Sequence, residues 1–223
     1  MVAAGRGTRV GGELPKQYLL IDGAPVLLHA IRPFVSHPDV ARVVVVLAPP
    51  EAENPPEFLS ILMGDALAVA AGGRERADSV AAGLRALPAG CDIVLVHDGA
   101  RPFVDRGVIE AVIAHARSGE GAVAAVPVSD TIKEAVGPDP TLVRRTVPRA
   151  GLWRAQTPQG FPRRLLEEAY ARAGVAASEA TDDASLVEAN GGVVRLVPDS
   201  PRNMKITTRD DLAMAEALAG AGR

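Results

Sequence analysis

Glycines and cations are gathered near the start of the chain, in the stretches AAGRGTR (residues 3–9) and PKQ (15–17). Glycine lets the backbone approach a polyphosphate closely, with amide N–H groups directed at its oxygens. Arg9 and Lys16 would add full charges to that cradle. The spacing fits neither a P-loop nor a complete dinucleotide fingerprint, because Gly11 and Gly12 fall out of register. The segment therefore predicts a phosphate-binding loop, with a plain tight turn as the alternative.

A second polar segment, GGRERADS, occupies residues 72–79 and follows the apolar run Leu67–Ala70. A double glycine between a strand and a helix can bring polar groups around a base or a ribose. The alternative is ordinary helix capping, with Asp78 or Ser79 as the N-cap residue.

A third segment, HDGARPF (residues 97–103), follows the apolar run Ile93–Val96. Asp98 is placed to hold Mg²⁺, which prefers one or two carboxylates together with substrate phosphates. Arg101 can bind a phosphate with two parallel hydrogen bonds. The alternative is a salt bridge between Asp98 and Arg101 across a turn. We expect His97 to support the loop, since no second histidine lies at ligand spacing.

Apolar runs and helical patterns alternate along the chain, and these elements must position the polar segments. The valine-rich runs show no alternation, which is typical of strands buried on both faces: Val43–Leu47, Leu67–Ala70, Ile93–Val96, Val123–Val128 and Val193–Val197. The helical patterns span Pro25–Val35, Ser79–Leu87, Val108–Arg117, Arg164–Ala173 and Leu212–Leu218. The order predicts an α/β fold with a doubly wound, mostly parallel, Rossmann-like sheet, which binds ligands beyond the carboxyl ends of its strands.

The remaining segments complete a single domain over residues 1–223. Residues 129–149 read as a protruding β-hairpin arm with Gly137, Pro138 and Pro140 at its turn, and arms of this kind often mediate dimer contacts. The proline-rich stretch 48–56 reads as a surface connection. A glycine-rich loop at Gly5 should follow a buried strand, so either that strand is very short or the natural chain begins upstream.

Composition excludes several classes of protein. The net charge of −3 offers no general basic field for nucleic acid. One cysteine, Cys91, allows no internal disulfide, and no apolar stretch approaches the ~20 residues that span a bilayer. We therefore expect a cytoplasmic protein without membrane or nucleic-acid partners. Arginine outnumbers lysine 21 to 3, which draws attention to Lys16, Lys133 and Lys205.

Seven motifs, taken in order, resemble those of one enzyme family: AAGRGTR, PKQY, GGRERADSV, VHDGARPF, SDTIK, LWRAQTPQGF and NMKIT. The family is that of the 2-C-methyl-D-erythritol 4-phosphate cytidylyltransferases, and the resemblance runs from about residue 2 to residue 219. It implies transfer of the cytidylyl group of CTP to that alcohol phosphate, with release of pyrophosphate, in isoprenoid precursor biosynthesis. It also implies a divalent cation such as Mg²⁺ and a homodimer joined through the arm.

The resemblance also implies a role for each matching residue. Arg9 and Lys16 would stabilise the transition state at the α-phosphorus, and Arg149 and Lys205 would position the alcohol phosphate. Asp98 would lie near the Mg²⁺. The nucleotide would contact Ala3, Ala4, Gly5, Gly7, Gly73, Arg76 and Ser79. The acceptor pocket would be completed by Arg101, Thr131 and Thr157, with Thr131 and Arg149 reaching over from the partner subunit's arm.

Three other functions remain open at this point. A ribitol 5-phosphate cytidylyltransferase is similar and differs in how it holds the acceptor. A non-catalytic nucleotide-binding module would not need Arg9, Lys16 and Lys205. A nicotinamide-dependent oxidoreductase would need a complete glycine fingerprint, which this sequence lacks.

Overall fold

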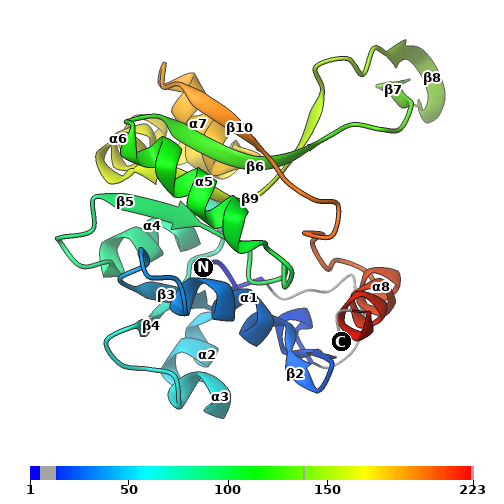
Figure 1. Ribbon diagram of the computed structural model, residues 1–223. Helices are drawn as coiled ribbons and strands as arrows, with labels where there is room; N and C mark the ends of the chain where they lie inside the picture. Colours follow the sequence, from blue (N-terminus) through cyan, green and yellow to red (C-terminus); the bar gives the residue numbers. More distant parts are fainter. Residues whose placement is uncertain (6–13, 138, 222–223) are drawn as a thin grey trace.

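The computed structural model describes residues 1–5, 14–137 and 139–221 (Figure 1). Its strands are β1 (Leu20–Ile21), β2 (Ala24–Pro25), β3 (Val43–Leu47), β4 (Leu67–Ala71), β5 (Ile93–Val96), β6 (Gly121–Pro127), β7 (Ile132–Val136), β8 (Asp139–Val147), β9 (Trp153–Pro162) and β10 (Val194–Pro198). Its helices are α1 (Val26–Val35), α2 (Pro49–Glu53), α3 (Glu57–Ser60), α4 (Arg76–Ala86), α5 (Arg106–Arg117), α6 (Arg163–Ala173), α7 (Asp183–Ala189) and α8 (Arg209–Gly220), with 3₁₀ turns η1 (Lys16–Tyr18) and η2 (Gly174–Glu179). The predicted α/β composition is confirmed, because each predicted strand and helix is present within a few residues of its expected bounds.

The first strand of the sheet is very short. Val2 pairs in parallel with Val46 of β3 and with Asp98, just past β5. Ala3 N–H donates to Val46 O at 2.8 Å, and Val2 N–H donates to His97 O at 2.8 Å. These few residues therefore join the parallel pair β3–β4 to the four-stranded sheet β10-β6-β9-β5.

Strand β9 is an antiparallel strand in a sheet that was predicted to be mostly parallel. It runs antiparallel to both β5 and β6, whereas β6 and β10 are parallel. The sequence did not indicate this strand because its residues include Pro158, Gly160 and two glutamines and show neither alternation nor a continuous apolar run.

Residues 48–56, read as a surface connection, contain the short helix α2, which begins with two prolines as helix starts often do and has no buried residue. One other expectation was wrong in detail. Strand β10 was expected to be buried on both faces, yet Leu196 is 47% exposed because β10 lies at the edge of its sheet.

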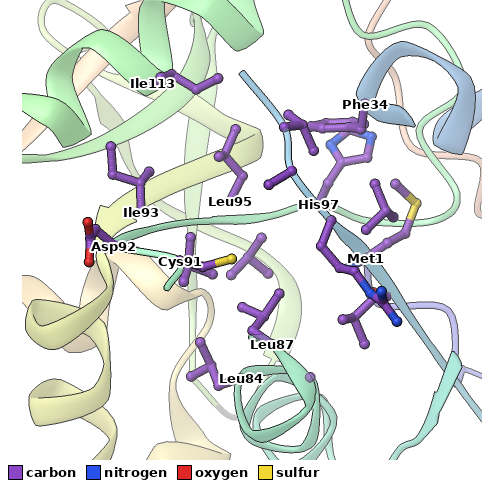
Figure 2. A pocket seen from close by; sticks show the side chains of 18 of the residues that line it. Met1, Phe34, Leu84, Leu87, Cys91, Asp92, Ile93, Leu95, His97 and Ile113 are labelled. Atoms are coloured by element: carbon purple, nitrogen blue, oxygen red, sulfur yellow. The ribbon is translucent and has the colours of Figure 1, made fainter. Parts of the chain in front are cut away.

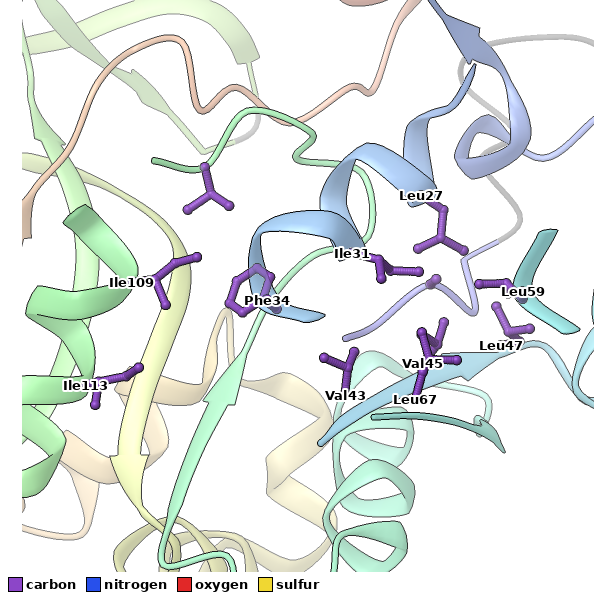
Figure 3. Packing of buried hydrophobic residues seen from close by; sticks show 12 residues of the cluster. Leu27, Ile31, Phe34, Val43, Val45, Leu47, Leu59, Leu67, Ile109 and Ile113 are labelled. Atoms are coloured by element: carbon purple, nitrogen blue, oxygen red, sulfur yellow. The ribbon is translucent and has the colours of Figure 1, made fainter. Parts of the chain in front are cut away.

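Two apolar clusters cover opposite faces of the sheet, because successive strand residues point to opposite sides. On one face, Leu27, Ile31 and Phe34 of α1 and two isoleucines of α5 pack against β3 (Figure 3). On the other face, α4, α6 and α7 pack against Val94 and Val96 of β5. These helices thereby hold in place the ends of the strands, and the polar segments identified in the sequence begin directly after those ends.

The predicted arm region contains an antiparallel hairpin formed by β7 and β8. Figure 1 shows this hairpin extending away from the rest of the protein beyond β6 and β9. Within the described ranges, no helix combines the length and the apolar character needed to cross a bilayer.

Candidate functional site

A cavity of about 280 Å³ with several charged side chains in its lining lies beyond the carboxyl ends of the short strand at Val2, β4 and β5, where a sheet of this kind is expected to bind its ligand. Three of the predicted segments meet there. Its lining includes nine of the residues predicted from the sequence: Ala3, Ala4, Gly5, Lys16, Gly73, Arg76, Ser79, Asp98 and Lys205. Segments from both ends of the chain therefore share one concave surface.

Asp98 is the carboxylate around which the cations gather. Lys205 Nζ lies 3.0 Å and Arg101 Nε 3.4 Å from its Oδ2, and Arg76 Nε lies 3.8 Å from its Oδ1. Burial alone would raise the pKa of Asp98, but the charges of Lys205, Arg76 and Arg101 outweigh it and hold that pKa well below its usual range. Asp98 is therefore ionised throughout the physiological range.

Arg76 is held from behind by a second carboxylate. Its Nη2 donates to Oδ2 of Asp183 at 2.7 Å, and the hydroxyl of Tyr170 donates to Oδ1 of the same residue at 2.6 Å. Asp183 is completely buried at the start of α7. Burial opposes the charge on Arg76, yet Asp183 and Asp98 together raise the pKa of its guanidinium above the usual value. Helix α7 thus fixes the position of a cation that lines the cavity.

The loop before α4 is shaped by its glycines and its cap. Glu75 is the N-cap residue and forms a capping box with Asp78, so the expectation that Asp78 or Ser79 is the N-cap was wrong. A Cβ atom at Gly73 would lie 2.2 Å from the Cβ of Asp78, so only glycine allows this approach. Ser79 is buried and donates to the carbonyl of Glu75 at 3.2 Å.

His97 and Thr157 support Asp98 from inside the protein. The Thr157 hydroxyl accepts a hydrogen bond from the backbone N–H of Asp98 at 3.0 Å and lies 2.9 Å from Nδ1 of His97. His97 Nε2 lies 3.1 Å from the carbonyl of Arg101, and burial lowers the pKa of His97 to about 4. The expectation that His97 supports the loop is confirmed. Thr157 is buried and is not among the residues that line the cavity.

Arg101 connects two of the loops. Besides its contact with Asp98, it donates from Nη1 to the carbonyl of Asn203 at 2.8 Å. Asn203 is completely buried and donates to Thr157 O at 2.8 Å. Because Asn203 precedes Lys205 by two residues, this network fixes the segment that carries the lysine. The salt bridge that sequence reasoning offered as an alternative for Arg101 is present.

The cavity carries a positive formal charge. Lys16, Arg74, Arg76 and Lys205 line it with four positive charges, against the two negative charges of Glu75 and Asp98. Lys16 lies in the 3₁₀ turn η1. The next residue of this turn, Gln17, is buried and donates to Ala3 O at 3.0 Å. A surface of this charge and depth suits a polyanion of small size.

The other predicted residues lie elsewhere. Thr131 and Arg149 belong to the arm region and do not line the cavity of the same chain, and Arg149 donates to the carbonyl of Ser129. Arg101 is engaged behind the cavity, as described above. Gly7 and Arg9 lie outside the described residues.

Asp98 offers one carboxylate that could bind a metal ion in this cavity. Among the described residues, no group of three or more His, Cys, Asp or Glu side chains could hold an ion. Mg²⁺ commonly uses one or two carboxylates and takes its other ligands from water and substrate phosphates. Oδ1 of Asp98 lies 3.8 Å from Arg76 Nε, a distance too long for a hydrogen bond, so this oxygen fits such a role.

Sequence reasoning missed the residues that stand behind the cavity, above all Asp183 and Tyr170. Gln159 is also buried, and it donates to Asp182 at 2.8 Å and accepts from the backbone of Ala184 at 2.9 Å. The local signal was the acidic pair at the start of α7, which reads as a helix cap. Asp182 is indeed the N-cap of α7, whereas Asp183 contacts Arg76 only through the tertiary fold.

Comparison with known proteins identifies one family over almost the whole chain. Residues 1–220 match the family described as IspD, 2-C-methyl-D-erythritol 4-phosphate cytidylyltransferase. The protein of that name from Alkaliphilus oremlandii is 40% identical over 98% of this chain and 92% of its own length. The bifunctional enzyme IspD/IspF of Rhodospirillum rubrum is 46% identical over 98% of this chain and 56% of its own length. The chain thus spans about half the length of several curated relatives that it matches.

The fold leads to the same family. The crystal structure of 2-C-methyl-D-erythritol 4-phosphate cytidylyltransferase from Thermus thermophilus superimposes with a TM-score of 0.80 at 38% identity, covering 98% of this chain and 96% of the other. The family model, the sequence relative and the solved structure each match nearly the whole chain, and all three carry the same enzyme name. The chain therefore belongs to the 2-C-methyl-D-erythritol 4-phosphate cytidylyltransferase family.

Proposed function

We propose that this protein transfers the cytidylyl group of CTP to 2-C-methyl-D-erythritol 4-phosphate, giving the CDP-alcohol and pyrophosphate in isoprenoid precursor biosynthesis. The observation that carries the proposal is the cation-lined cavity around Asp98, at the carboxyl ends of the strands. Family membership supports the identity of both substrates.

The nucleotide is assigned to the side of the cavity formed by the first strand and the start of α4. Backbone groups of Ala3, Ala4, Gly5 and Gly73 would surround the cytidine together with Arg76 and Ser79, and all six residues line the cavity. Gly7, which lies outside the described residues, would also contact the nucleotide. Support comes from the close approach that Gly73 permits and from the fixed position of Arg76.

The reaction requires no general base, because the nucleophile is an ionised phosphate oxygen of the acceptor. That oxygen forms a bond to the α-phosphorus of CTP, the bond from this phosphorus to the bridging oxygen of the β-phosphate breaks, and pyrophosphate leaves. Two anions must approach and negative charge spreads over the oxygens, so catalysis rests on positioning and electrostatic stabilisation. Lys16 and Arg9 would stabilise the α-phosphoryl group, and Lys205 would hold the acceptor phosphate.

Asp98 has two roles in this proposal. Its Oδ2 orients Lys205, and its Oδ1 would contribute one ligand to a divalent cation such as Mg²⁺. When bound, the ion neutralises charge on the phosphates of CTP. Thr157 and Arg101 act here as positioning residues, because their polar atoms hold the backbone of Asp98 and of Asn203.

The acceptor pocket is completed in this proposal by a second copy of the chain. Thr131 and Arg149 lie in the arm region, and Figure 1 shows the hairpin extending away from the body that holds the cavity. A homodimer in which each arm reaches the partner's cavity would bring these residues to the acceptor. We also propose that residues 1–223 form a single domain with a doubly wound, Rossmann-like sheet. We further propose that the protein is located in the cytoplasm.

The test is pyrophosphate release from CTP and Mg²⁺ with 2-C-methyl-D-erythritol 4-phosphate in one reaction and ribitol 5-phosphate in a parallel one. We expect release with the first acceptor only. Release with ribitol 5-phosphate alone would keep the chemistry and refute the assigned acceptor. A folded dimer that releases pyrophosphate with neither acceptor would refute the proposed function.

A further inference from the structure

The turn that carries Lys16 is joined to the short strand at Val2 by one buried side chain. Gln17, the next residue of η1, is 3% exposed, and its Nε2 donates to Ala3 O at 3.0 Å. The two bonded residues come before and after residues 6–13, which lie outside the described ranges. Both Ala3 and Lys16 line the candidate site. The hydrogen bond from Gln17 therefore links two separate parts of that lining.

The strand at Val2 runs from an apolar region to the candidate site. Figure 2 shows Met1 at one end of the strand, in a second cavity of about 280 Å³ whose lining includes Phe34. At the other end of the strand, Ala3 lines the cavity around Asp98. Ala3 is thus the residue through which a contact with this strand can act on the site.

The register of the strand shows which group the Gln17 amide replaces. Val46 N–H donates to Met1 O and Ala3 N–H donates to Val46 O, both at 2.8 Å. In a parallel ladder that continued in this register, the N–H of residue 48 would donate to Ala3 O. Ala48 is instead the N-cap residue of α2, so strand β3 has already ended there. The side chain of Gln17 supplies the donor for Ala3 O.

The other side of η1 contacts α2 and α3. The Tyr18 hydroxyl donates to Oε2 of Glu51 at 2.8 Å, and the Tyr18 ring meets that of Phe58 edge to face, with centroids 6.3 Å apart. The backbone N–H of Tyr18 donates to Pro15 O at 2.9 Å, which closes the turn around Lys16. Lys16 therefore lies between an anchor on these helices and the bond to the strand.

The position of the Lys16 amine depends on the backbone that carries it. Lys16 is half-buried, and its flexible stem is fixed only at the turn. Without the Gln17 amide, the buried carbonyl of Ala3 would lack this donor, so the turn or the strand would have to move to supply another. A displacement of about 1 Å in a group that acts on a transition state can cost about 10²-fold in rate.

We propose that Gln17 is a positioning residue, which holds Lys16 in the cavity by bonding its turn to Ala3 of the neighbouring strand. The effect on the reaction rests on the proposed function, whereas the placement of Lys16 can be measured without any substrate. Gln17 also contributes to the lining of the cavity, so a direct contact with the nucleotide is the alternative to be separated.

The first experiment measures acylation of the free protein by an N-hydroxysuccinimide ester, followed by mass spectrometry. The sequence contains three lysines, so the rate at Lys16 is measured separately, with Lys133 on the exposed hairpin as the internal reference. Gln17→Leu removes the amide, and Gln17→Glu places there a carboxylate that cannot donate. We expect acylation of Lys16 relative to Lys133 to rise about threefold or more in both variants, because the turn is released. An unchanged ratio would overturn the proposal.

The second experiment measures kcat with CTP, Mg²⁺ and 2-C-methyl-D-erythritol 4-phosphate in the presence and absence of the Lys16 side chain. We expect Gln17→Leu to lower kcat about 10–100-fold while KM for CTP changes less than about threefold. In the Lys16→Ala background, the same substitution should cost less than about threefold, because its effect acts through the lysine. An equal loss in both backgrounds would assign Gln17 its own contact with substrate and overturn the proposal.

Tyr18→Phe is the matched control. It removes a hydrogen bond from the same turn, on the side of Glu51, and keeps the ring against Phe58. We expect kcat and the acylation of Lys16 to change less than about twofold. Changes as large as those in Gln17→Leu would indicate general damage to the turn and overturn the proposal. An unsubstituted protein without transferase activity would refute the proposed function, and the acylation ratio would still decide whether Gln17 places Lys16.

Discussion

Lys205 Nζ lies 3.0 Å from Oδ2 of Asp98, although the two residues come from distant segments of the chain. Arg101 and Arg76 approach the same carboxylate, so Asp98 keeps two cationic neighbours when the lysine is removed. Lys205 is also 38% exposed, whereas Asp98 is buried. The lysine can therefore be substituted with little harm to the fold, which makes its proposed role in catalysis testable.

Lys205→Ala and Lys16→Ala are each expected to reduce kcat/KM by about 10²–10³, the usual cost of losing a well-placed donor to a developing charge. Circular dichroism and Tm should stay close to those of the unsubstituted protein. Lys133→Ala is the matched control, because Lys133 lies on the exposed hairpin and donates to Thr146. Near-normal turnover in either of the first two variants would remove that lysine from the mechanism.

Asp183→Asn is expected to weaken CTP binding, because Arg76 then loses the charge that holds it in place. The predicted result is a KM for CTP that is about tenfold higher with a smaller change in kcat. Asp182→Asn is the control, since asparagine also caps helices and the Asp182 carboxylate bonds to Gln159 and to the backbone of Ser185. A kcat that falls as far as KM rises would indicate general damage to the site instead.

The arm is expected to act on the partner's cavity, and mixed dimers test this. Arg149→Ala and Lys205→Ala chains should each be nearly inactive alone. When they are co-expressed, half of the dimers contain one intact site, so activity should recover to about a quarter of normal. A mixture of Lys16→Ala and Lys205→Ala chains should not recover, because each of those sites carries its own defect. Equal recovery in both mixtures, or in neither, contradicts an arm that acts across the dimer.

Stability is expected to fall as the pH is lowered from neutral. The pKa of His97 is about 4 in the folded protein against 6.5 in the unfolded chain, so the unfolded state binds the proton first. The resulting loss is about 3 kcal/mol, beginning near pH 6.5 and complete near pH 4. The pKa of the Met1 α-amino group is lowered from 8.0 to about 5. This group therefore also reduces the stability of the folded protein as the pH falls, in the range from about pH 8 to pH 5.

Urea unfolding across this pH range measures the effect, and His97→Gln isolates the imidazole. The variant should show a shallower dependence on pH, with only the Met1 contribution above pH 5. Asp98, whose pKa is depressed, contributes stability that is lost at still lower pH. A His97→Gln profile parallel to that of the unsubstituted protein would refute the role given to the buried imidazole.

Local sequence pattern was sufficient for the strands that carry the site. Val43–Leu47 is a continuous apolar run, and the structure has a strand with the same bounds. Asp98 could be placed because it lies two residues after such a run, Ile93–Val96, and strand ends of a parallel sheet meet at one edge. Strand β9 could not be predicted, since its pairing with β5 and β6 rather than its composition makes it a strand.

Contacts that depend on the tertiary fold were beyond sequence reasoning. Asp183 reaches Arg76 only through the tertiary fold, in which α4 and α7 contribute to one apolar cluster on the same face of the sheet. Contact of Thr157 with substrate stays a prediction, whereas the bonds of its hydroxyl to His97 and to the backbone of Asp98 were not predicted. No spacing rule separates a threonine that faces a cavity from one that stands behind it.

The most direct test of the central claim is the appearance of the CDP-alcohol and pyrophosphate in equal amounts from CTP, Mg²⁺ and 2-C-methyl-D-erythritol 4-phosphate, followed by phosphorus NMR. The account predicts both products with the unsubstituted protein and a loss of about 10²–10³ in rate with Lys205→Ala. Pyrophosphate without the CDP-alcohol, or equal rates in the two proteins, would contradict cytidylyl transfer at the cavity around Asp98.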